Sequence, residues 1–295
     1  MKYFFNLFCL FVFLASNVSG QVEKILESHS ANIFLEGFAK ELYSQKDYER
    51  AYNEFDRFVF LNKGKLNLDS TFMYLAKCSI GLKRYDNANK ILKNLLDSPY
   101  DKHNAELRNS AVYFYSYSLF LQEKNEMSLK ILNTESPQDT SFIKSSLIAL
   151  NYLQLRNYKL SKEAILNKNP NNSEILFLID NGEKISYKSP FLAGLFSAII
   201  PGTGKIYTER TFDGLFSLIS IGILTWRAYL GFHEDQYNST SFWFYGSLSA
   251  LLYAGNVYGS VKSAELYNEQ LNVNYNFKIR CQLDKIFKIF DCDPN

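Results

Sequence analysis

The sequence has few of the residue types that enzymes most often use for chemistry. Its 295 residues include 3 histidines and 4 cysteines. No G-x-S-x-G, H-E-x-x-H or C-x-x-C motif occurs in it. We interpret the run His233-Glu234-Asp235 as a solvated loop, because neighbouring residues rarely converge on one metal ion. We therefore expect no enzyme, and no catalytic residue, cofactor or metal site.

A strong charge of either sign is also missing. The formal net charge is +2 and charged residues make up 21% of the chain, so the composition indicates no nucleic-acid partner. Aromatic residues are abundant, with 25 Phe and 21 Tyr. Together with the many Asn, Lys and Ile residues they also fit an AT-rich genome, so their number alone indicates no function.

The stretch PGTGKIYT (201–208) shares the string GTGK with nucleotide-binding loops, but the rest of that pattern is missing. The Walker A motif, G-x-x-x-x-G-K-[ST], needs a first glycine and a final hydroxyl residue that holds magnesium. With Gly204 and Lys205 in register, those two positions are Ile199 and Ile206. The sequence therefore argues against nucleotide binding here.

The N-terminus has the three parts of a secretory signal peptide. Lys2 supplies a positive charge, residues 4–15 are apolar, and Val18-Ser19-Gly20 places a small residue before Gln21. We expect residues 1–20 to be cleaved and the mature chain to be exported.

Three cysteines remain in the mature chain. Cys281 and Cys292 lie close together near the C-terminus, where we expect an exported protein to bridge them. Cys78 lies in an apolar helical stretch, which favours a small buried residue over a reactive thiol.

Residues 30–170 contain a pattern that recurs. A small residue is followed nine positions later by Tyr, three positions further by another small residue, and four later by a large apolar one. The complete copies are Ala39, Tyr48, Ala51 and Phe55; Ala76, Tyr85, Ala88 and Leu92; and Ala149, Tyr158, Ser161 and Ile165. A weaker copy at 116–132 has Asn125 in place of the Tyr but keeps Ser128 and Leu132.

This pattern resembles the tetratricopeptide repeat, in degenerate form, because the consensus Trp and Gly positions are missing. The resemblance implies helix pairs joined by short turns that stack into a solenoid over residues 21–186. It also implies binding of a protein or peptide partner. An unrelated helical bundle and a mere spacer are the alternatives. Residues 173–185, capped by Ser173, read as a final amphipathic helix.

From Ser189 onward the chain becomes strongly apolar. Segments 190–201, 214–226 and 242–261 contain no charged residue. A spanning helix needs about 20 mainly apolar residues, which the last segment supplies, and the middle one does so if Arg227 snorkels to the interface. The first is too short and reads as a re-entrant or interfacial helix. We therefore expect a mainly α-helical chain with a membrane hairpin at 187–263, the alternative being a buried soluble hairpin.

The stretch PGTGKIY would turn the chain between the short helix and the first span. Pro201 ends the short helix, and Gly202 and Gly204 permit a sharp turn. Basic and aromatic residues that we expect among lipid headgroups follow: Lys205, Tyr207 and Arg210.

Residues 197–216 also resemble a turn pattern of exported bacterial membrane-hairpin domains of unknown function, distantly like the two-transmembrane domain family. The matching residues are Ser197, Pro201, Gly202, Gly204, Tyr207, Asp213 and Gly214. The small residue usual after the Tyr is replaced by Thr208-Glu209. We read Asp213 first as a charge favoured at a helix N-terminus, and second as a functional carboxylate at the membrane boundary.

Residues 264–295 form the C-terminal tail. In NVNYNFKIRC (272–281) apolar and polar residues alternate, which predicts a half-buried strand with KIFKIF (285–290) as its candidate partner. Two spans would return this tail to the side of the repeats, outside the cytoplasm. The basic residues that flank the hairpin indicate the opposite orientation, since the loop at 231–241 has none. We prefer the orientation that the signal peptide implies.

The sequence thus predicts an exported repeat scaffold, anchored in the bacterial inner membrane, that binds a protein partner on the periplasmic side without enzymatic activity. The alternative is that the hairpin is the active part, a small homo-oligomeric membrane module for lipid or solute passage that the repeats regulate. An Asp213 side chain that faces the hairpin interior would favour the alternative.

Overall fold

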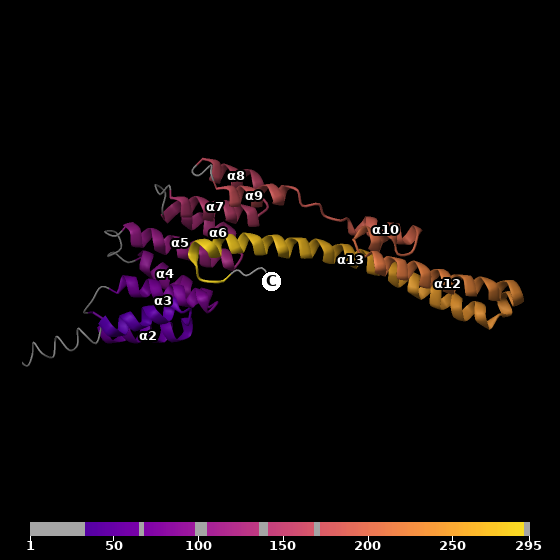
Figure 1. Cartoon of the computed structure of the whole chain (residues 1–295), viewed down its shortest axis with the longest axis horizontal. Helices are drawn as coiled ribbons and strands as arrows, with labels where there is room; N and C mark the ends of the chain where they lie inside the picture. Colours follow the sequence, from indigo (N-terminus) through magenta and orange to yellow (C-terminus); the bar gives the residue numbers. More distant parts are fainter. Residues whose placement is uncertain (1–32, 65–67, 98–104, 136–140, 168–171, 292–295) are drawn as a thin grey trace, which may run out of the picture. The chain divides into compact units, whose positions relative to one another are not determined.

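The computed structural model describes residues 33–64, 68–97, 105–135, 141–167 and 172–291. These residues are almost entirely helical, and no strand occurs among them. Residues 33–44 are helical. The helices that follow are α2 (Tyr48–Asn62), α3 (Asp69–Gly81), α4 (Tyr85–Asp97), α5 (Ala105–Leu121), α6 (Asn125–Glu135), α7 (Phe142–Gln154), α8 (Tyr158–Leu166), α9 (Ser173–Glu183), α10 (Pro190–Ile199), α11 (Thr203–Tyr207), α12 (Thr211–Asp235), the 3-10 helix η2 (Gln236–Asn238) and α13 (Thr240–Phe287) (Figure 1).

The chain forms two compact units. The first combines the residues up to Leu176 with those from Arg280 onward, and the second is Phe177–Ile279. Helices α9 and α13 each contribute residues to both units. These limits differ from the expected division at residues 186 and 263, because the end of α13 packs with the repeats. The expected signal peptide, residues 1–20, lies outside the described residues.

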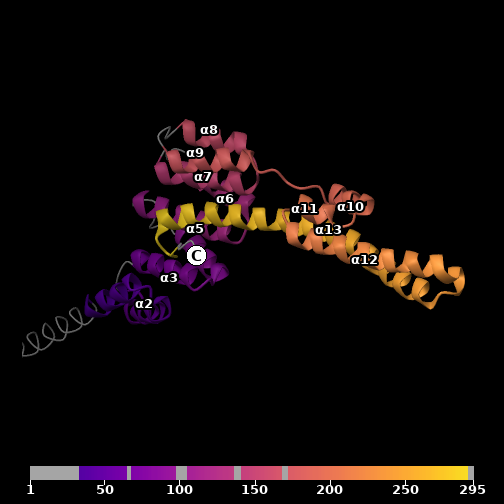
Figure 2. The same ribbon diagram turned by 45° about the vertical axis from the view of Figure 1, so that its right-hand side comes forward.

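The first unit is a stack of helix pairs, which confirms the predicted helical-hairpin solenoid. The pairs are residues 33–44 with α2, α3 with α4, α5 with α6, and α7 with α8. From α2 to α8 each helix contacts the next along the chain, within a pair and between pairs. Figures 1 and 2 show the helices of this unit following one another in chain order.

Small residues lie where the two helices of each pair cross. Ser128 Oγ donates a hydrogen bond to the carbonyl oxygen of Ser116 at 3.0 Å, and Ser161 Oγ donates to that of Ala149 at 2.9 Å. A hydroxyl can reach the backbone of the facing helix only where the two backbones approach closely. All of the small residues at these crossings are fully buried: Ala39, Ala51, Ala76, Ala88, Ser116, Ser128, Ala149 and Ser161.

The two helices of each described pair are joined by the same turn. Lys83 has a left-handed backbone with φ 59°; its N–H donates to Ile80 O, and the next N–H, of Arg84, donates to Ser79 O. This pair of bonds is the Schellman arrangement, which satisfies carbonyls at the end of the first helix and usually uses glycine. The equivalent residues in the other pairs also have positive φ: Lys46, Glu123 and Arg156.

The residues that follow each turn fill the space between pairs. The large apolar residues of the pattern are fully buried: Phe55, Leu92, Leu132 and Ile165. Tyr48 is buried and its ring lies against the backbone of Gly81, where an added Cβ would be 2.3 Å from the ring. Tyr85 and Tyr158 are half-buried, and Asn125 is buried in the same place. The first pair is therefore locked onto the turn of the second.

Side-chain caps start several helices, and one differs from the expectation. Asp47, Ser141 and Asn157 accept hydrogen bonds from backbone N–H groups three residues ahead, which satisfies donors at the helix start. At α9 the cap is Asn172, whose Oδ1 accepts from Ile175 N at 3.2 Å. The predicted cap at Ser173 was therefore wrong by one residue, since Ser173 is already the first helical residue.

The predicted strand in the tail is wrong, because residues 272–281 continue helix α13. The alternating apolar residues also contain a spacing of four, which places Tyr275 and Ile279 on one helix face. Those two are buried, with 4% and 0% of their surface exposed, whereas Val273 and Phe277 are 59% and 46% exposed. The helical period thus decides which apolar residues are buried. The expected partner strand, residues 285–290, does not form either, because residues 285–287 are the end of α13.

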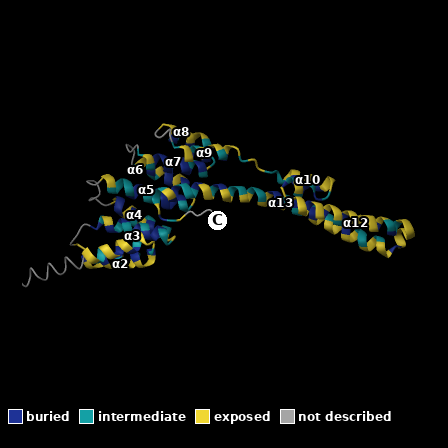
Figure 3. Cartoon of the chain, viewed as in Figure 1, coloured by how far each residue is buried: buried dark blue, intermediate teal, exposed yellow. Residues whose placement is uncertain are grey.

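The second unit contains α10, α11, α12 and most of α13. Among the described residues one helix is long and apolar enough to cross a membrane, at Thr211–Asn238, and α10 is a shorter apolar helix. Most of the α12 surface is exposed (Figure 3). The other expected span, 242–261, lies within α13, which does not meet the same criterion. His233, Glu234 and Asp235 form the last turn of α12 rather than a loop, and all three are exposed.

Replacing Lys83 by glycine should stabilise the repeat unit. A residue with a Cβ in the left-handed region costs about 1–2 kcal/mol, and glycine loses about 0.5–1 kcal/mol more chain entropy on folding, so the net gain is roughly 0.5–1 kcal/mol. We expect the midpoint of thermal unfolding of the detergent-solubilised chain to rise by about 1–4 °C. Lys90→Gly, on the exposed face of α4, is the control and should lower it. Equal losses in both variants would contradict this account of the turn.

Candidate functional site

The structure offers two places where polar side chains gather. One is the turn between α10 and α12 in the second unit. The other is a surface of the repeats on which the end of the chain packs, within the first unit. We call the second the tail-docking surface and define it by Lys46, Tyr48, Phe114, Tyr117 and Glu174.

The turn between α10 and α12 depends on close backbone contacts at its glycines. Gly202 has φ 87°, and a Cβ there would lie 2.0 Å from the carbonyl oxygen of Gly214. A Cβ on Gly204 would lie 1.9 Å from the carbonyl oxygen of Ala193. Gly204 is thus needed for helix packing rather than for a left-handed backbone. Pro201 lies between the end of α10 at Ile199 and the start of α11 at Thr203.

Ser197 connects three elements of this turn. Its side chain is fully buried, and its Oγ accepts a hydrogen bond from Gly204 N at 2.9 Å. The same oxygen lies 2.6 Å from Ser260 Oγ on α13. The serine therefore ties α10 to α11 and to α13, which is a structural role.

Tyr207 and Asp213 lie at the edge of the same turn. Tyr207 Oη accepts from Ser189 N at 3.2 Å, and the Lys188 ammonium lies 5.0 Å from the centre of its ring. Asp213 is in the first turn of α12, half exposed, and its carboxylate forms an ion pair with Arg210. Asp213 therefore does not face the hairpin interior, and its position fits a charge at a helix N-terminus.

Polar groups do converge inside the hairpin, from other residues. Lys205, expected among headgroups, donates from its Nζ to Ser217 Oγ on α12 at 2.8 Å. Asn256 on α13 is 4% exposed, and its side-chain amide has no hydrogen-bond partner among the described residues. Further hydroxyl pairs join the helices: Thr208 with Ser263 at 2.6 Å and Thr225 with Ser249 at 2.7 Å.

At the tail-docking surface, the end of α13 packs on aromatic residues of α5. The ring of Phe287 stacks on that of Tyr117, with centroids 4.3 Å apart and planes 8° from parallel. Phe114 meets the same ring edge-on at 5.0 Å. The Tyr117 hydroxyl donates to the carboxylate of Asp284, and both side chains are almost fully buried. Aromatic pairs in such geometries add about 0.5–1.5 kcal/mol to their area burial.

Beyond Phe287 the chain leaves the helix and packs on the first pair. Lys288 has φ 56°, which ends α13, and Ile289 is 1% exposed. The Tyr48 hydroxyl donates to the carbonyl oxygen of Ile289 at 2.6 Å. Lys46 forms an ion pair with Asp291, although both groups are well exposed and the pair adds little stability.

Burial perturbs the ionisation of the groups at this surface. Loss of solvent raises the pKa of the Asp284 carboxyl above its ordinary value of 3.8, against the opposing effects of the Tyr117 hydrogen bond and of Arg280. Loss of solvent and the Asp284 carboxylate together raise the pKa of the Tyr117 phenol. Asp284 therefore resists ionisation in the folded chain, while Tyr117 stays a donor.

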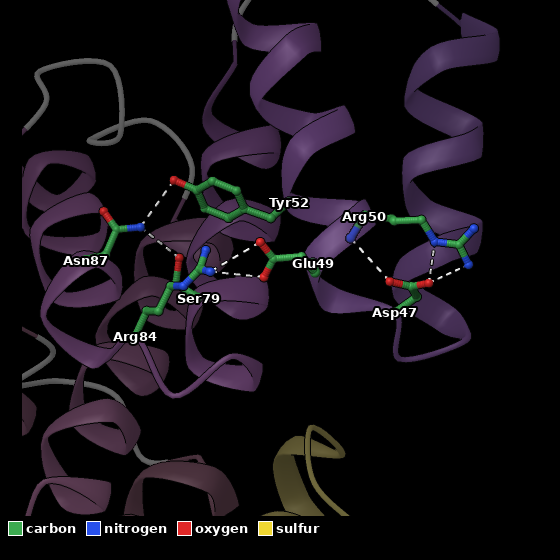
Figure 4. Close-up of polar contacts among 7 residues, drawn as sticks. All are labelled: Asp47, Glu49, Arg50, Tyr52, Ser79, Arg84 and Asn87. Carbon is green, nitrogen blue, oxygen red and sulfur yellow. Dashed lines mark hydrogen bonds and ion pairs between the residues drawn. The ribbon is translucent and has the colours of Figure 1, made fainter.

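Other polar contacts of the repeats hold the first two pairs together. Arg84 contacts both carboxylate oxygens of Glu49, at 3.0 and 3.2 Å (Figure 4). Asn87 donates to the hydroxyls of Tyr52 and Ser79, and Arg50 pairs with Asp47 in the cap of α2 (Figure 4). Glu49, Arg50 and Arg84 are exposed, whereas Ser79 is fully buried. These contacts interlock structural elements and offer no arrangement of acid, base and nucleophile.

Metal-binding side chains do not gather anywhere in the described part of the chain, where no group of three or more His, Cys, Asp or Glu could hold an ion. A small pocket beside α3 and α4 is lined by Asp69, Phe72, Ile91, Asn94 and Leu95. Cys78 is a buried free thiol whose pKa burial raises to about 12. Cys281 is disulfide-bonded, but Cys292 lies outside the described residues, so the pairing of these two cysteines stays a prediction.

The turn was predictable from the sequence, but the tail-docking surface was not. Tyr117 lies in the weaker repeat copy and Phe287 in the stretch 285–290, yet neither these residues nor Phe114 and Asp284 were expected to form a contact surface. A signal was present in the spacing of Tyr275, Ile279 and Leu283, which are four apart and continue a helical face into the tail. The strand-like alternation of the same segment concealed it.

Alanine at Gly202 or Gly204 should disrupt the second unit. The added methyl group would overlap backbone atoms by more than a side chain can relieve, so we expect a loss of at least about 3 kcal/mol. Gly222 in α12 has no atom within 4 Å of an added Cβ. Gly222→Ala is the matched control and should stabilise by roughly 0.5–1 kcal/mol. Thermal unfolding of the three detergent-solubilised variants checks this, and tolerance of alanine at both turn positions would contradict the geometry.

Asparagine at Asp284 should remove part of the pH dependence of stability. The folded chain holds the Asp284 proton to a higher pH than the unfolded chain does, so folding weakens as the pH rises from about 4 through the raised pKa. Asp284→Asn still accepts from Tyr117 and does not titrate, so its unfolding midpoint should fall less over this interval and exceed the wild-type value at about pH 7.

Thermal unfolding of both proteins across this pH range provides the measurement. Asp284→Ala serves as the control, because it leaves the buried Tyr117 hydroxyl without this acceptor and should lower the midpoint at every pH. A difference between wild type and Asp284→Asn that did not change with pH would refute the assignment.

Comparisons with protein-family models, with curated proteins and with solved structures gave no match to this chain.

Proposed function

We propose that this protein is an exported, membrane-anchored repeat scaffold that holds a partner protein at the bacterial inner membrane and has no enzymatic activity. The observation that carries the proposal is the combination of two units with different surfaces. One is a stack of helix pairs, an architecture whose extended surface suits protein or peptide binding. The other contains an apolar helix, α12, with most of its surface exposed.

The position of the chain end supports a hairpin that crosses the membrane twice. Residues 280–291 pack within the same unit as the repeats, so both lie on the same side of any membrane. The chain between them must then cross an even number of times. If α12 crosses once, a second crossing is required, and residues 242–261 at the start of α13 form the uncharged stretch available for it.

Export to the periplasmic side rests on the N-terminal sequence. Residues 1–20 combine a basic start, an apolar segment and a small-residue cleavage position, as secretory signals do. An even number of crossings keeps the repeats and the chain end together on that side, where a disulfide at Cys281 is stable.

A second function, a membrane module formed by the hairpin, has one observation in its favour. The amide of Asn256 is buried in the second unit, and Lys205 is half-buried against Ser217; polar groups inside membrane hairpins are often functional. Asp213, the residue expected to mark this function, is instead half exposed and paired with Arg210. We therefore favour the scaffold.

Photocrosslinking in intact cells distinguishes the two functions. A photoreactive residue would replace Phe60, which is 81% exposed on the repeats, or Ile219, which is 59% exposed on α12. We expect the first position to capture one particular protein, and the second to capture none beyond a second copy. Cys78, fully buried, is the control position and should capture neither. Crosslinks from Ile219 alone, leading only to copies of this chain, would favour the membrane module.

A further inference from the structure

The chain end contacts the repeats as a peptide ligand would. Its contacts come from a few anchors separated by short intervals: the carboxylate of Asp284, the ring of Phe287 and the side chain of Ile289. Asp284 and Ile289 have 3% and 1% of their surface exposed. Phe287 stacks on Tyr117, and Tyr48 holds the backbone carbonyl of Ile289. A buried anchor cluster with directional hydrogen bonds is the arrangement that gives peptide recognition its specificity.

The receiving residues come from separate parts of the array. Lys46 belongs to the turn of the first pair and Tyr48 to the start of α2. Phe114 and Tyr117 belong to α5, and Glu174 to the start of α9. The end thus lies across several pairs, which is the kind of extended surface that stacked helix pairs offer to a partner. The ammonium group of Lys77 on α3 lies 4.7 Å from the centre of the Phe114 ring, so a cation borders the aromatic site.

Charges at the two ends of this contact set its direction. Asp291 pairs with Lys46 at the first pair, and Lys285 pairs with Glu174 at 3.0 Å near α9. Both pairs are exposed, so they add little energy but disfavour the reversed orientation, in which like charges would meet. A ligand for this surface therefore needs a side-chain hydrogen-bond acceptor for Tyr117, an aromatic ring three residues later, an apolar residue two beyond that, and an acidic residue after a further two.

We propose that residues 282–291 are a self-ligand that occupies the partner-binding surface of the repeats, and that the partner presents an amphipathic segment of the same chemistry, with an Asp-x-x-Phe-x-Ile arrangement of anchors. This inference rests on the proposed scaffold function. Because the self-ligand is part of the same chain, its docking is intramolecular, so a free segment of equal affinity competes poorly. The partner binds only where it is locally concentrated or where the self-ligand is released.

A labelled peptide of residues 282–291, QLDKIFKIFD, tests the proposal on the full-length chain in detergent. Fluorescence anisotropy would compare its binding to wild type and to the double variant Asp284→Ala, Phe287→Ala, whose own end lacks two anchors. We expect the variant to bind the peptide at least about tenfold more tightly than wild type does. A peptide with the same two substitutions is the control ligand. Lys278→Ala, at an exposed position of α13 outside residues 282–291, is the control protein and should behave as wild type.

Three outcomes would overturn the proposal. They are a folded variant that does not bind, equal binding to both proteins, and loss of the helical circular dichroism spectrum both in the double variant and in the milder variant Ile289→Ala. The last would make the chain end an indispensable part of the core. No cellular partner enters this experiment, so it tests the docking surface alone. The photocrosslinking experiment tests the scaffold function, and the two proposals can therefore fail separately.

Discussion

The repeat unit depends on the close approach of the two helices within each pair. Alanine or serine at both crossing positions removes the side chains that would hold the backbones apart, and hydroxyl-to-carbonyl bonds at Ser128 and Ser161 report how short that distance is. With the backbones this close, the chain must reverse within a few residues, which the left-handed residue of each turn achieves. The large residues then have only one place to pack, between neighbouring pairs. Burial of Phe55, Leu92 and Ile165 follows from the small residues rather than the reverse.

Close backbone approach also organises the second unit, where glycine rather than alanine permits it. Gly202, Gly204 and Gly214 let backbone atoms of α10, α11 and α12 meet directly, where any Cβ would overlap a neighbouring atom. Ser197 and Lys205 then hydrogen-bond across these contacts, so their polar groups are satisfied inside an otherwise apolar unit. The string that resembles a nucleotide-binding loop is therefore a helix-packing motif.

Residues 282–291 pack on the repeats through a buried polar contact between Asp284 and Tyr117, which no sequence motif indicates. Asp284 is in an apolar environment that raises the pKa of its carboxyl, and Tyr117 supplies the hydrogen bond that makes its burial tolerable. Desolvation of such a pair costs free energy, but the pair fixes the register of the contact, because Asp284 accepts the Tyr117 hydrogen bond on α5. The two proposals made above, an even number of membrane crossings and a self-ligand, both rest on this placement.

The sequence by itself determined the helix pairs and the turn motif, because small residues, periodicity and glycine act through neighbours that are close along the chain. It could not decide the state of residues 272–281, where the same apolar residues fit a strand with period two and a helix with spacing four. Only tertiary contacts chose between them, by burying Tyr275 and Ile279 and leaving Val273 and Phe277 exposed. The tail-docking surface was likewise decided by the tertiary structure, because Tyr117 and Asp284 are far apart in sequence and have no local pattern that links them.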